Sequence, residues 1–352
     1  MEECHTSPLS MPLRTRIHSI DAFRAIANWA IICVHTVPFM VATFSPNVQF
    51  FGELLNQFVR IATPFFFLAA GYFFAVSLER GAMAVPLARK LIKRLVLLFA
   101  FWSIVYVLVP IDILLDMPEA GYWSAVRVMM PRLISVRFFL NGTSIHLWFL
   151  PALSCALALL AAACRFRLER GLIGLSAALF LIGLAAGAYK ATPIGLDLGM
   201  NTRNGPFFST IFVVSGFMIH RLRLIPTLRE AISLIVLGAA LRILELLWIT
   251  GQYGTSPSRI DYLLGTYPFG VGIFLLLLTA KRLGEIKWMV GLSRYSAGVY
   301  CAHGLIVALL RARHPVVAYP LWEIARPFAV LALTLALVMS LAKVPVLRPV
   351  MT

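Results

Sequence analysis

One apolar stretch near the start of the chain carries four polar side chains at helical spacing: Asp21, Arg24, Asn28 and His35. At roughly 100° per residue, all four fall within about 60° of one another and form one stripe on a helix. Ionisable groups inside a membrane helix are costly unless they face the interior of a helix bundle. Histidine titrates near neutral pH and is the most frequent general base. The stripe therefore predicts a buried functional site that contains His35.

The composition indicates a membrane protein. The 352 residues are 60% hydrophobic and 13% charged, with a mean hydropathy of +0.87, whereas a soluble domain is nearer a quarter charged. Apolar stretches of about 20 residues recur along the chain, each long enough to cross a bilayer core of about 30 Å. We therefore expect an all-α, polytopic membrane helical bundle. About ten transmembrane helices are predicted, at 18–40, 58–78, 95–113, 146–164, 171–189, 205–220, 230–250, 262–280, 290–311 and 322–342.

The connections between these stretches alternate in charge. If the N-terminus is cytoplasmic, the cytoplasmic connections hold about twice as many Lys and Arg residues as the outer ones, and the positive-inside rule places both termini in the cytoplasm. We expect a cytoplasmic tail at 1–17, one membrane domain at 18–342 and a second cytoplasmic tail at 343–352. The formal net charge of +16 does not indicate nucleic-acid binding, because the basic residues lie between apolar stretches and form no single patch.

Depth in the membrane separates the polar residues into two groups. His35 lies about 21 Å from Asp21 along its helix, in the outer half of the bilayer. The predicted helices place the other members of an outer group at a similar depth: Arg60, His146 and His303. An inner group lies on the cytoplasmic side and consists of Arg24, Arg89, Lys90, Lys93 and Arg94.

This separation suggests acyl transfer across the membrane. Arg and Lys are the usual partners of phosphate, so we expect the inner group to hold an anionic cytoplasmic donor. The outer histidines are expected to act on an acceptor hydroxyl. Simpler interpretations stay open. The inner group can be membrane anchors, His146 and Trp148 can be interfacial belt residues, and His303 can be a histidine bonded to a neighbouring helix.

Five stretches together resemble the acyltransferase 3 family of integral-membrane acyltransferases over nearly the full length. The length of the chain and its last two predicted helices look most like the branch of surface-polysaccharide O-acetyltransferases that includes the enzyme acetylating enterobacterial common antigen. The family usually has serine before the glycine of the second stretch, where this chain has Ala70, so we assign Ala70 no role. The stretches are Asp21-Ala-Phe-Arg24 with His35, Arg60 to Tyr72, His146-Leu-Trp148, Ser215-Gly216-Phe217, and Gly291 to His303.

The resemblance implies a reaction and its participants. The donor is acetyl-CoA or another acyl-CoA, used as a co-substrate, and no cofactor is bound permanently. The acceptor is a hydroxyl of a cell-surface or lipid-linked carbohydrate, and the protein is a multi-pass protein of the bacterial inner membrane. The five cysteines show no metal-ligand spacing, so no metal site is expected.

The resemblance also implies roles for individual residues. His35 becomes the catalytic histidine, and Arg60 stabilises negative charge on the thioester oxygen. Asp21 and Arg24 support the donor channel. The remaining donor-binding residues are expected to be Arg89, Lys90 and Arg94. The acceptor side is expected to contain His146, Trp148, Ser296, Tyr300 and His303.

A transporter or flippase for an anionic lipid-linked sugar is the alternative. Intramembrane His, Arg and Asp residues also serve proton relays. No convincing internal repeat is present, which weakens the case for a transporter built from repeated halves.

Overall fold

The computed structural model describes residues 17–40, 44–116, 119, 121–135, 138–280, 287–313 and 319–352. Most of the predicted tail at 1–17 lies outside these residues. The described residues form helices joined by loops and contain no β-strand. The helices are α1 (His18–Thr36), α2 (Pro46–Val59), α3 (Ala62–Glu79), α4 (Ala84–Leu108), α5 (Ile111–Asp116), α6 (Gly121–Ile134), α7 (Phe138–Asn141), α8 (Phe149–Phe166), α9 (Glu169–Ala185), α10 (Pro206–Arg221), α11 (Leu228–Tyr253), α12 (Thr266–Thr279), α13 (Lys287–Leu292), α14 (Ser296–Arg313), α15 (Pro320–Leu341) and α16 (Arg348–Met351).

Each of the ten predicted membrane stretches overlaps at least one of these helices, and the described residues contain no strand, so the all-α prediction is confirmed. Among the described residues, however, five helical segments are long and apolar enough to cross a membrane, not ten. Helices α9, α10 and α12 are shorter than a full span, and α1 and α14 carry the polar residues of the site. The five segments are Pro46–Glu79, Ala84–Asp116, Phe149–Phe166, Leu228–Tyr253 and Pro320–Leu341.

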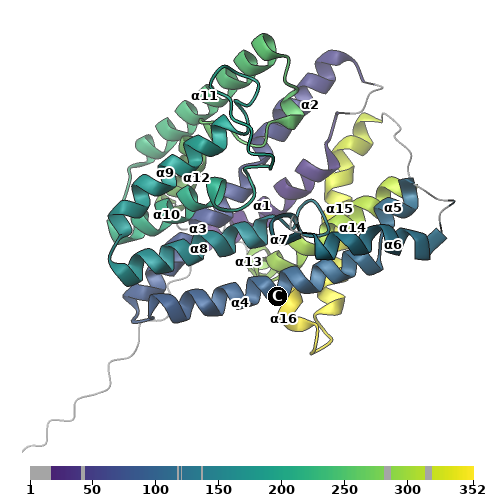
Figure 1. The fold of residues 1–352 in the computed structure, drawn as a ribbon, viewed down its shortest axis with the longest axis horizontal. Helices are drawn as coiled ribbons and strands as arrows, with labels where there is room; N and C mark the ends of the chain where they lie inside the picture. Colours follow the sequence, from purple (N-terminus) through teal and green to yellow (C-terminus); the bar gives the residue numbers. More distant parts are fainter. Residues whose placement is uncertain are drawn as a thin grey trace, which may run out of the picture.

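Helices α1 and α3 run through the middle of the bundle (Figure 1). Helix α3 packs against α10, α11 against α12, α4 against α8, and α14 against α15. Helix α1 contacts α3, α14 and α15, so protein surrounds much of it. This packing meets the requirement that an ionisable stripe faces the interior of a bundle.

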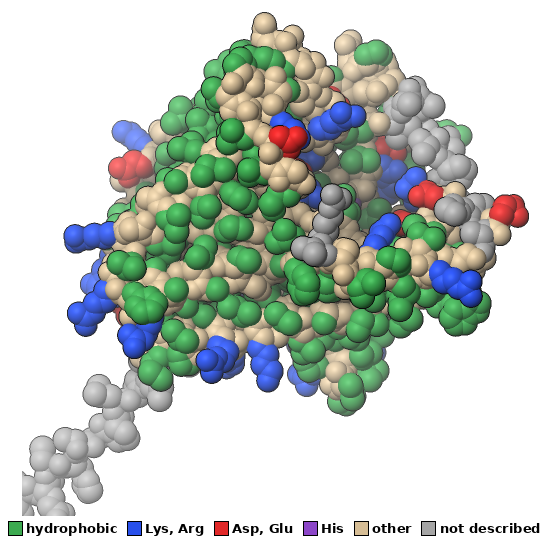
Figure 2. Space-filling view, viewed as in Figure 1, with side chains coloured by type: hydrophobic (Ala, Val, Ile, Leu, Met, Phe, Trp, Pro, Cys, Tyr) green, Lys and Arg blue, Asp and Glu red, His purple; other side chains and the backbone are tan. Residues whose placement is uncertain are grey.

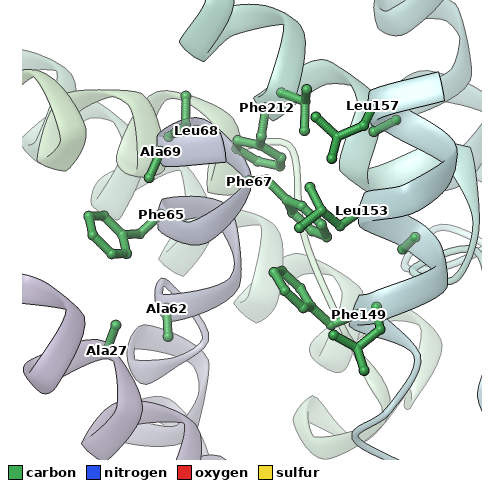
Figure 3. Close-up of a cluster of buried hydrophobic side chains, with 14 of the residues drawn as sticks. Ala27, Ala62, Phe65, Phe67, Leu68, Ala69, Phe149, Leu153, Leu157 and Phe212 are labelled. Carbon is green, nitrogen blue, oxygen red and sulfur yellow. The ribbon is translucent and has the colours of Figure 1, made fainter. Parts of the chain in front are cut away.

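Aromatic and small side chains fill the centre of the bundle. Figure 3 shows side chains of α1, α3, α8 and α10 converging on one cluster. Within it, the rings of Phe67 and Phe149 are stacked with centroids 4.6 Å apart. Ala27 and Ala62 are completely buried, and their small size lets the backbones of α1 and α3 approach each other.

Two glycines fix the crossing of α3 and α10. A Cβ atom on Gly71 would lie 1.9 Å from the carbonyl oxygen of Val213, and a Cβ atom on Gly216 would lie 2.0 Å from that of Leu68. The two helices therefore touch backbone to backbone, as small residues allow in membrane bundles. The glycines of the second and fourth stretches quoted above thus have a packing role.

The outer surface of the bundle is apolar. Hydrophobic side chains cover much of the face in Figure 2, and Lys and Arg side chains gather along its lower and left edges. Helix α4 alone exposes Val96, Leu97, Ile104 and Leu108. An apolar band bordered by basic residues is typical of a protein embedded in a bilayer.

Candidate functional site

Three histidine rings meet between α1, α14 and the loop before α8. His35 lies in the last turn of α1, His146 in that loop, and His303 within α14. The ring centroid of His303 lies 5.1 Å from that of His35 and 4.6 Å from that of His146, and the His35 and His146 centroids are 5.8 Å apart. In the described part of the chain, no group of His, Cys, Asp or Glu is arranged to hold a metal ion.

Both ring nitrogens of His146 are engaged in hydrogen bonds. Its Nε2 lies 3.1 Å from the carbonyl oxygen of Cys301 and 3.2 Å from the hydroxyl of Tyr106. A carbonyl oxygen only accepts, so Nε2 carries the proton and Nδ1 accepts from the hydroxyl of Ser144 at 3.2 Å. His146 is therefore held in one tautomer and one orientation by its surroundings.

His303 has one engaged nitrogen and one free nitrogen. Its Nδ1 lies 2.6 Å from the carbonyl oxygen of Tyr300, one turn earlier in α14, so Nδ1 carries the proton. Its Nε2 is buried and has no hydrogen-bond partner among the described residues. His303 thus keeps a lone pair available next to the other two rings.

Of the three histidines, His35 is the one whose ring nitrogens are both available to a substrate. It is half-buried and lines a cavity, and neither of its nitrogens hydrogen-bonds to another described residue. We call this space the outer cavity. Its polar and aromatic lining consists of His35, Arg60, Thr63, His146, Trp148, Arg203, Phe208, Asp261 and Tyr300.

A carboxylate between two guanidinium groups forms one wall of the outer cavity. Asp261 Oδ1 lies 3.0 Å from Arg60 Nη1 and 2.8 Å from Arg203 Nη1, and Asn201 donates to Oδ2 at 2.8 Å. Burial raises the pKa of Asp261, but the charges of Arg203 and Arg60 outweigh burial and hold that pKa below its ordinary value of 3.8. The wall keeps one net positive charge beside His35.

Sequence reasoning identified Arg60 but missed Arg203 and Asp261. Both lie in connections, before α10 and α12, where helical periodicity carries no information. The available signal was topological, because the predicted orientation placed both connections on the same outer side as Arg60.

A second and larger space, the inner cavity, lies nearer the other end of α1. Its empty volume is about 1630 Å³, counting the part that opens to solvent. The guanidinium of Arg24 lies 2.9 Å from Asp21 Oδ1 and 5.5 Å from the ring centroid of Phe73. Asp21 does not line the cavity and acts on it by orienting Arg24. The polar lining residues are Arg24, Ser77, Arg94, Ser293, Arg294, Ser296, Tyr300 and Thr352.

Three predicted site residues lie elsewhere than expected. Arg89 lines a different groove, formed by α4 and α8, and Lys90 is exposed and lines neither cavity. Arg94 reaches the inner cavity and donates to the backbone carbonyl of Thr352, because it lies about 140° around α4 from Arg89. Ser296 lines the inner cavity and not the acceptor side, because it lies about 10 Å from His303 along α14.

Tyr300 borders both cavities. Its ring lies 5.3 Å from that of Phe149, and its hydroxyl donates a hydrogen bond to the backbone carbonyl of His146. The side chain therefore stands between the basic inner cavity and the histidines of the outer cavity.

The chain is similar to several known proteins. Residues 17–343 match the Acyl_transf_3 family model, described as an acyltransferase domain. Among curated proteins, the chain is similar to an amino-acid racemase of Enterococcus faecalis, 26% identical over 59% of this chain and 30% of that protein. A serine/alanine racemase of Enterococcus gallinarum is 28% identical over 57% of this chain and 29% of its own length. The chain thus spans less than a third of these relatives, and no solved structure matches it significantly.

Proposed function

Because the chain belongs to the acyltransferase 3 family, we propose that it moves an acetyl group from cytoplasmic acetyl-CoA to a hydroxyl of a cell-surface or lipid-linked carbohydrate. The observation that carries this proposal is the position of Tyr300 between a basic cavity and an unbonded histidine. Acetyl-CoA is a long polyanion with its thioester at one end, and its charges and its reactive carbon need separate environments.

The proposed orientation follows from the same separation. Both termini lie in the cytoplasm of a bacterial inner-membrane protein, an orientation favoured by the excess of Lys and Arg in the connections on that side. The inner cavity then opens toward the cytoplasm, where acyl-CoA is made. Arg24 and Arg94 bind the donor phosphates there, since guanidinium groups form bidentate bonds with phosphate.

Direct transfer of the acetyl group requires no reactant other than the donor and the acceptor. His35 removes the proton from the acceptor hydroxyl as its oxygen attacks the thioester carbon. The positive charge of Arg60 and Arg203 stabilises the negative charge that develops on the carbonyl oxygen. The C–S bond then breaks, and the leaving thiolate takes the proton from His35. An ester and free coenzyme A are the products.

The proposal is tested by thiol release from acetyl-CoA. The purified protein in detergent receives acetyl-CoA with and without a membrane glycan extract, as wild type and as His35→Ala. We expect release that requires the extract and is lost in the variant. His220→Gln is the matched control, because His220 pairs with Glu79 at the far end of α10.

Each outcome of this assay has a defined meaning. Release that persists at the wild-type rate in a folded His35→Ala protein contradicts the role of His35. A folded wild-type protein that consumes no acyl-CoA with any extract contradicts the enzyme and favours the transporter. Melting temperatures of all three proteins establish that each variant is folded.

A further inference from the structure

A third hollow adjoins the outer cavity on the side away from the inner cavity. Its walls are the end of α6, helix α7, the loop before α8 and the loop before α10. It shares Trp148 and Arg203 with the outer cavity, so the two spaces meet at these side chains. We call it the side pocket. Neither the predicted acceptor residues nor the transfer step uses its remaining lining.

The side pocket presents polar groups suited to a sugar. Amide side chains of Asn141, Asn201 and Asn204 line it, and each offers both donors and acceptors to hydroxyl groups. Asn204 donates to Asn141 through Nδ2, while its Oδ1 is buried without a hydrogen-bond partner among the described residues. The indole of Trp148 supplies an apolar face against which sugar C–H groups can pack.

The charged side chains that line the side pocket are all positive. Arg132 and Arg203 both line it, and its described lining contains no Asp or Glu. Arg132 donates to the carbonyl of Thr143 at 3.3 Å and forms no ion pair within the described chain. Asp112 of α5 interacts electrostatically with Arg132, but it also interacts with Arg311 and stands outside the pocket.

Arg203 is only partly neutralised. Its Nη1 binds Asp261, which it shares with Arg60, and its guanidinium lies 5.2 Å from the ring centroid of Trp148. Its Nε is buried and has no hydrogen-bond partner among the described residues. The protein partners of Arg203 therefore leave part of its hydrogen-bonding capacity unused. Because Arg203 lines the side pocket, an anionic oxygen there would pair with its remaining charge.

We infer that the side pocket is an acceptor subsite for an anionic carbohydrate, with a carboxylate or phosphate oxygen of the sugar bound by Arg132 and Arg203. This inference rests on the proposed function, because it assigns the acceptor of that same site. The sugar ring packs on Trp148, and a hydroxyl of the ring or of the next residue reaches His35 in the outer cavity.

Binding without a donor tests the subsite apart from the transfer reaction. Ligand-observed NMR on the detergent-solubilised protein compares methyl β-glucoside, methyl β-glucuronide and glucose 1-phosphate. We expect at least one charged sugar to bind about tenfold more tightly than the neutral one, a difference of ~1.4 kcal/mol. The preferred sugar identifies the source of the charge, and added salt should weaken the preference.

Substitutions in α6 then test whether Arg132 provides the preference for a charged sugar. Arg132→Gln should reduce the preference for the charged sugar, and Arg132→Lys should retain part of it. Arg127→Gln, on the same helix but exposed and outside the pocket, is the matched control and should keep the preference. The same sugars are finally offered as acceptors in the thiol-release assay, where Arg132→Gln should raise KM more than it lowers kcat.

Failure of the inference and failure of the proposed function give different results. Equal binding of neutral and charged sugars by the wild type, or an equal loss in the Arg127 and Arg132 variants, overturns the subsite. Charge-selective binding with no acceptor-dependent thiol release supports the subsite and overturns acyl transfer.

Discussion

The hydroxyl of Tyr300 donates a hydrogen bond to the backbone carbonyl of His146, and this bond ties α14 to the loop before α8. The two residues lie side by side in the lining of the outer cavity but come from different elements, and Tyr300 also lines the inner cavity. An acyltransferase that holds a thioester here must keep water from replacing the acceptor.

Removing this ring is expected to uncouple the donor from the acceptor. Tyr300→Ala should raise acceptor-independent thiol release from acetyl-CoA roughly tenfold, the effect of about 1.4 kcal/mol on the barrier. Tyr300→Phe is the matched control, since it keeps the ring and loses only the bond to His146. Equal, low background release in both variants would show that the ring is no barrier to water.

The free lone pair of His303 leads to a second prediction. His303→Asn keeps an N–H donor near the position of Nδ1 and removes Nε2, whereas His303→Gln places a polar group near Nε2 and removes the bond to Tyr300. If Nε2 accepts a hydrogen bond during the transfer step, His303→Gln should retain roughly tenfold more acetyl transfer than His303→Asn.

If His303 serves only to stabilise the fold, the activities of the two variants should rank in the opposite order. In that case His303→Asn would be the better enzyme, and the melting temperatures would follow the activities. His35→Gln sets the lower limit, because loss of a general base costs about 10²–10⁴-fold in kcat.

The depth of the site follows from the sequence, whereas its lateral contacts do not. The rise of about 1.5 Å per residue fixes how far His35 lies from Asp21, and hydropathy indicates which stretches are helices. Rotation of one helix against another depends on packing that no single stretch encodes. Helical periodicity places Arg89 and Arg94 on different faces of α4, but which of these faces borders the inner cavity depends on that packing.

Loops are the other source of error. The predicted site was assembled from helices, where periodicity assigns faces, and so it omitted Asp261 and Arg203. Neither residue belongs to a periodic stretch, and their pairing depends on the path of two connections. The side pocket could not be predicted for the same reason, because its walls are mostly loops and short helices.

The inner cavity predicts which basic residues bind the donor. Arg24→Gln and Arg94→Gln should each raise KM for acetyl-CoA about tenfold, since a charge-assisted bond to phosphate is worth ~1.5–3 kcal/mol. Arg170→Gln, an exposed residue of α9 outside both cavities, is the control and should leave KM unchanged. A rise in KM for acetyl-CoA in Arg89→Gln as large as that in Arg24→Gln would show that Arg89 also binds the donor.

The Asp261 network predicts a pH dependence of stability. Folding lowers the pKa of Asp261 below its ordinary value of 3.8. A depressed carboxyl pKa contributes stability above the pKa of the unfolded chain, and that stability is lost as the pH falls through the folded value. The melting temperature of the wild type should therefore drop as the pH is lowered from about 5 toward 3.

Two variants isolate this contribution. Asp261→Asn should lower stability at pH 7 by about 3 kcal/mol, because it leaves two guanidinium groups without their counter-charge, and it should flatten the acid dependence. Asp116→Asn removes an exposed acid that pairs with Arg311, and it should change neither quantity measurably. An acid profile of Asp261→Asn that parallels the wild type would mean that another group causes the drop.

The backbone contact between α3 and α10 gives a second stability prediction. A methyl group on Gly71 or Gly216 meets a carbonyl oxygen of the facing helix, which is backbone and cannot rotate away. Gly71→Ala and Gly216→Ala should each destabilise the protein by about 1–3 kcal/mol and shift α3, which carries part of both cavities. Gly174→Ala on α9 has no atom within 4 Å of the new methyl and should be neutral or slightly stabilising. Melting curves in detergent distinguish these cases, and a Gly71→Ala protein as stable as Gly174→Ala would mean that the two helices do not meet at these glycines.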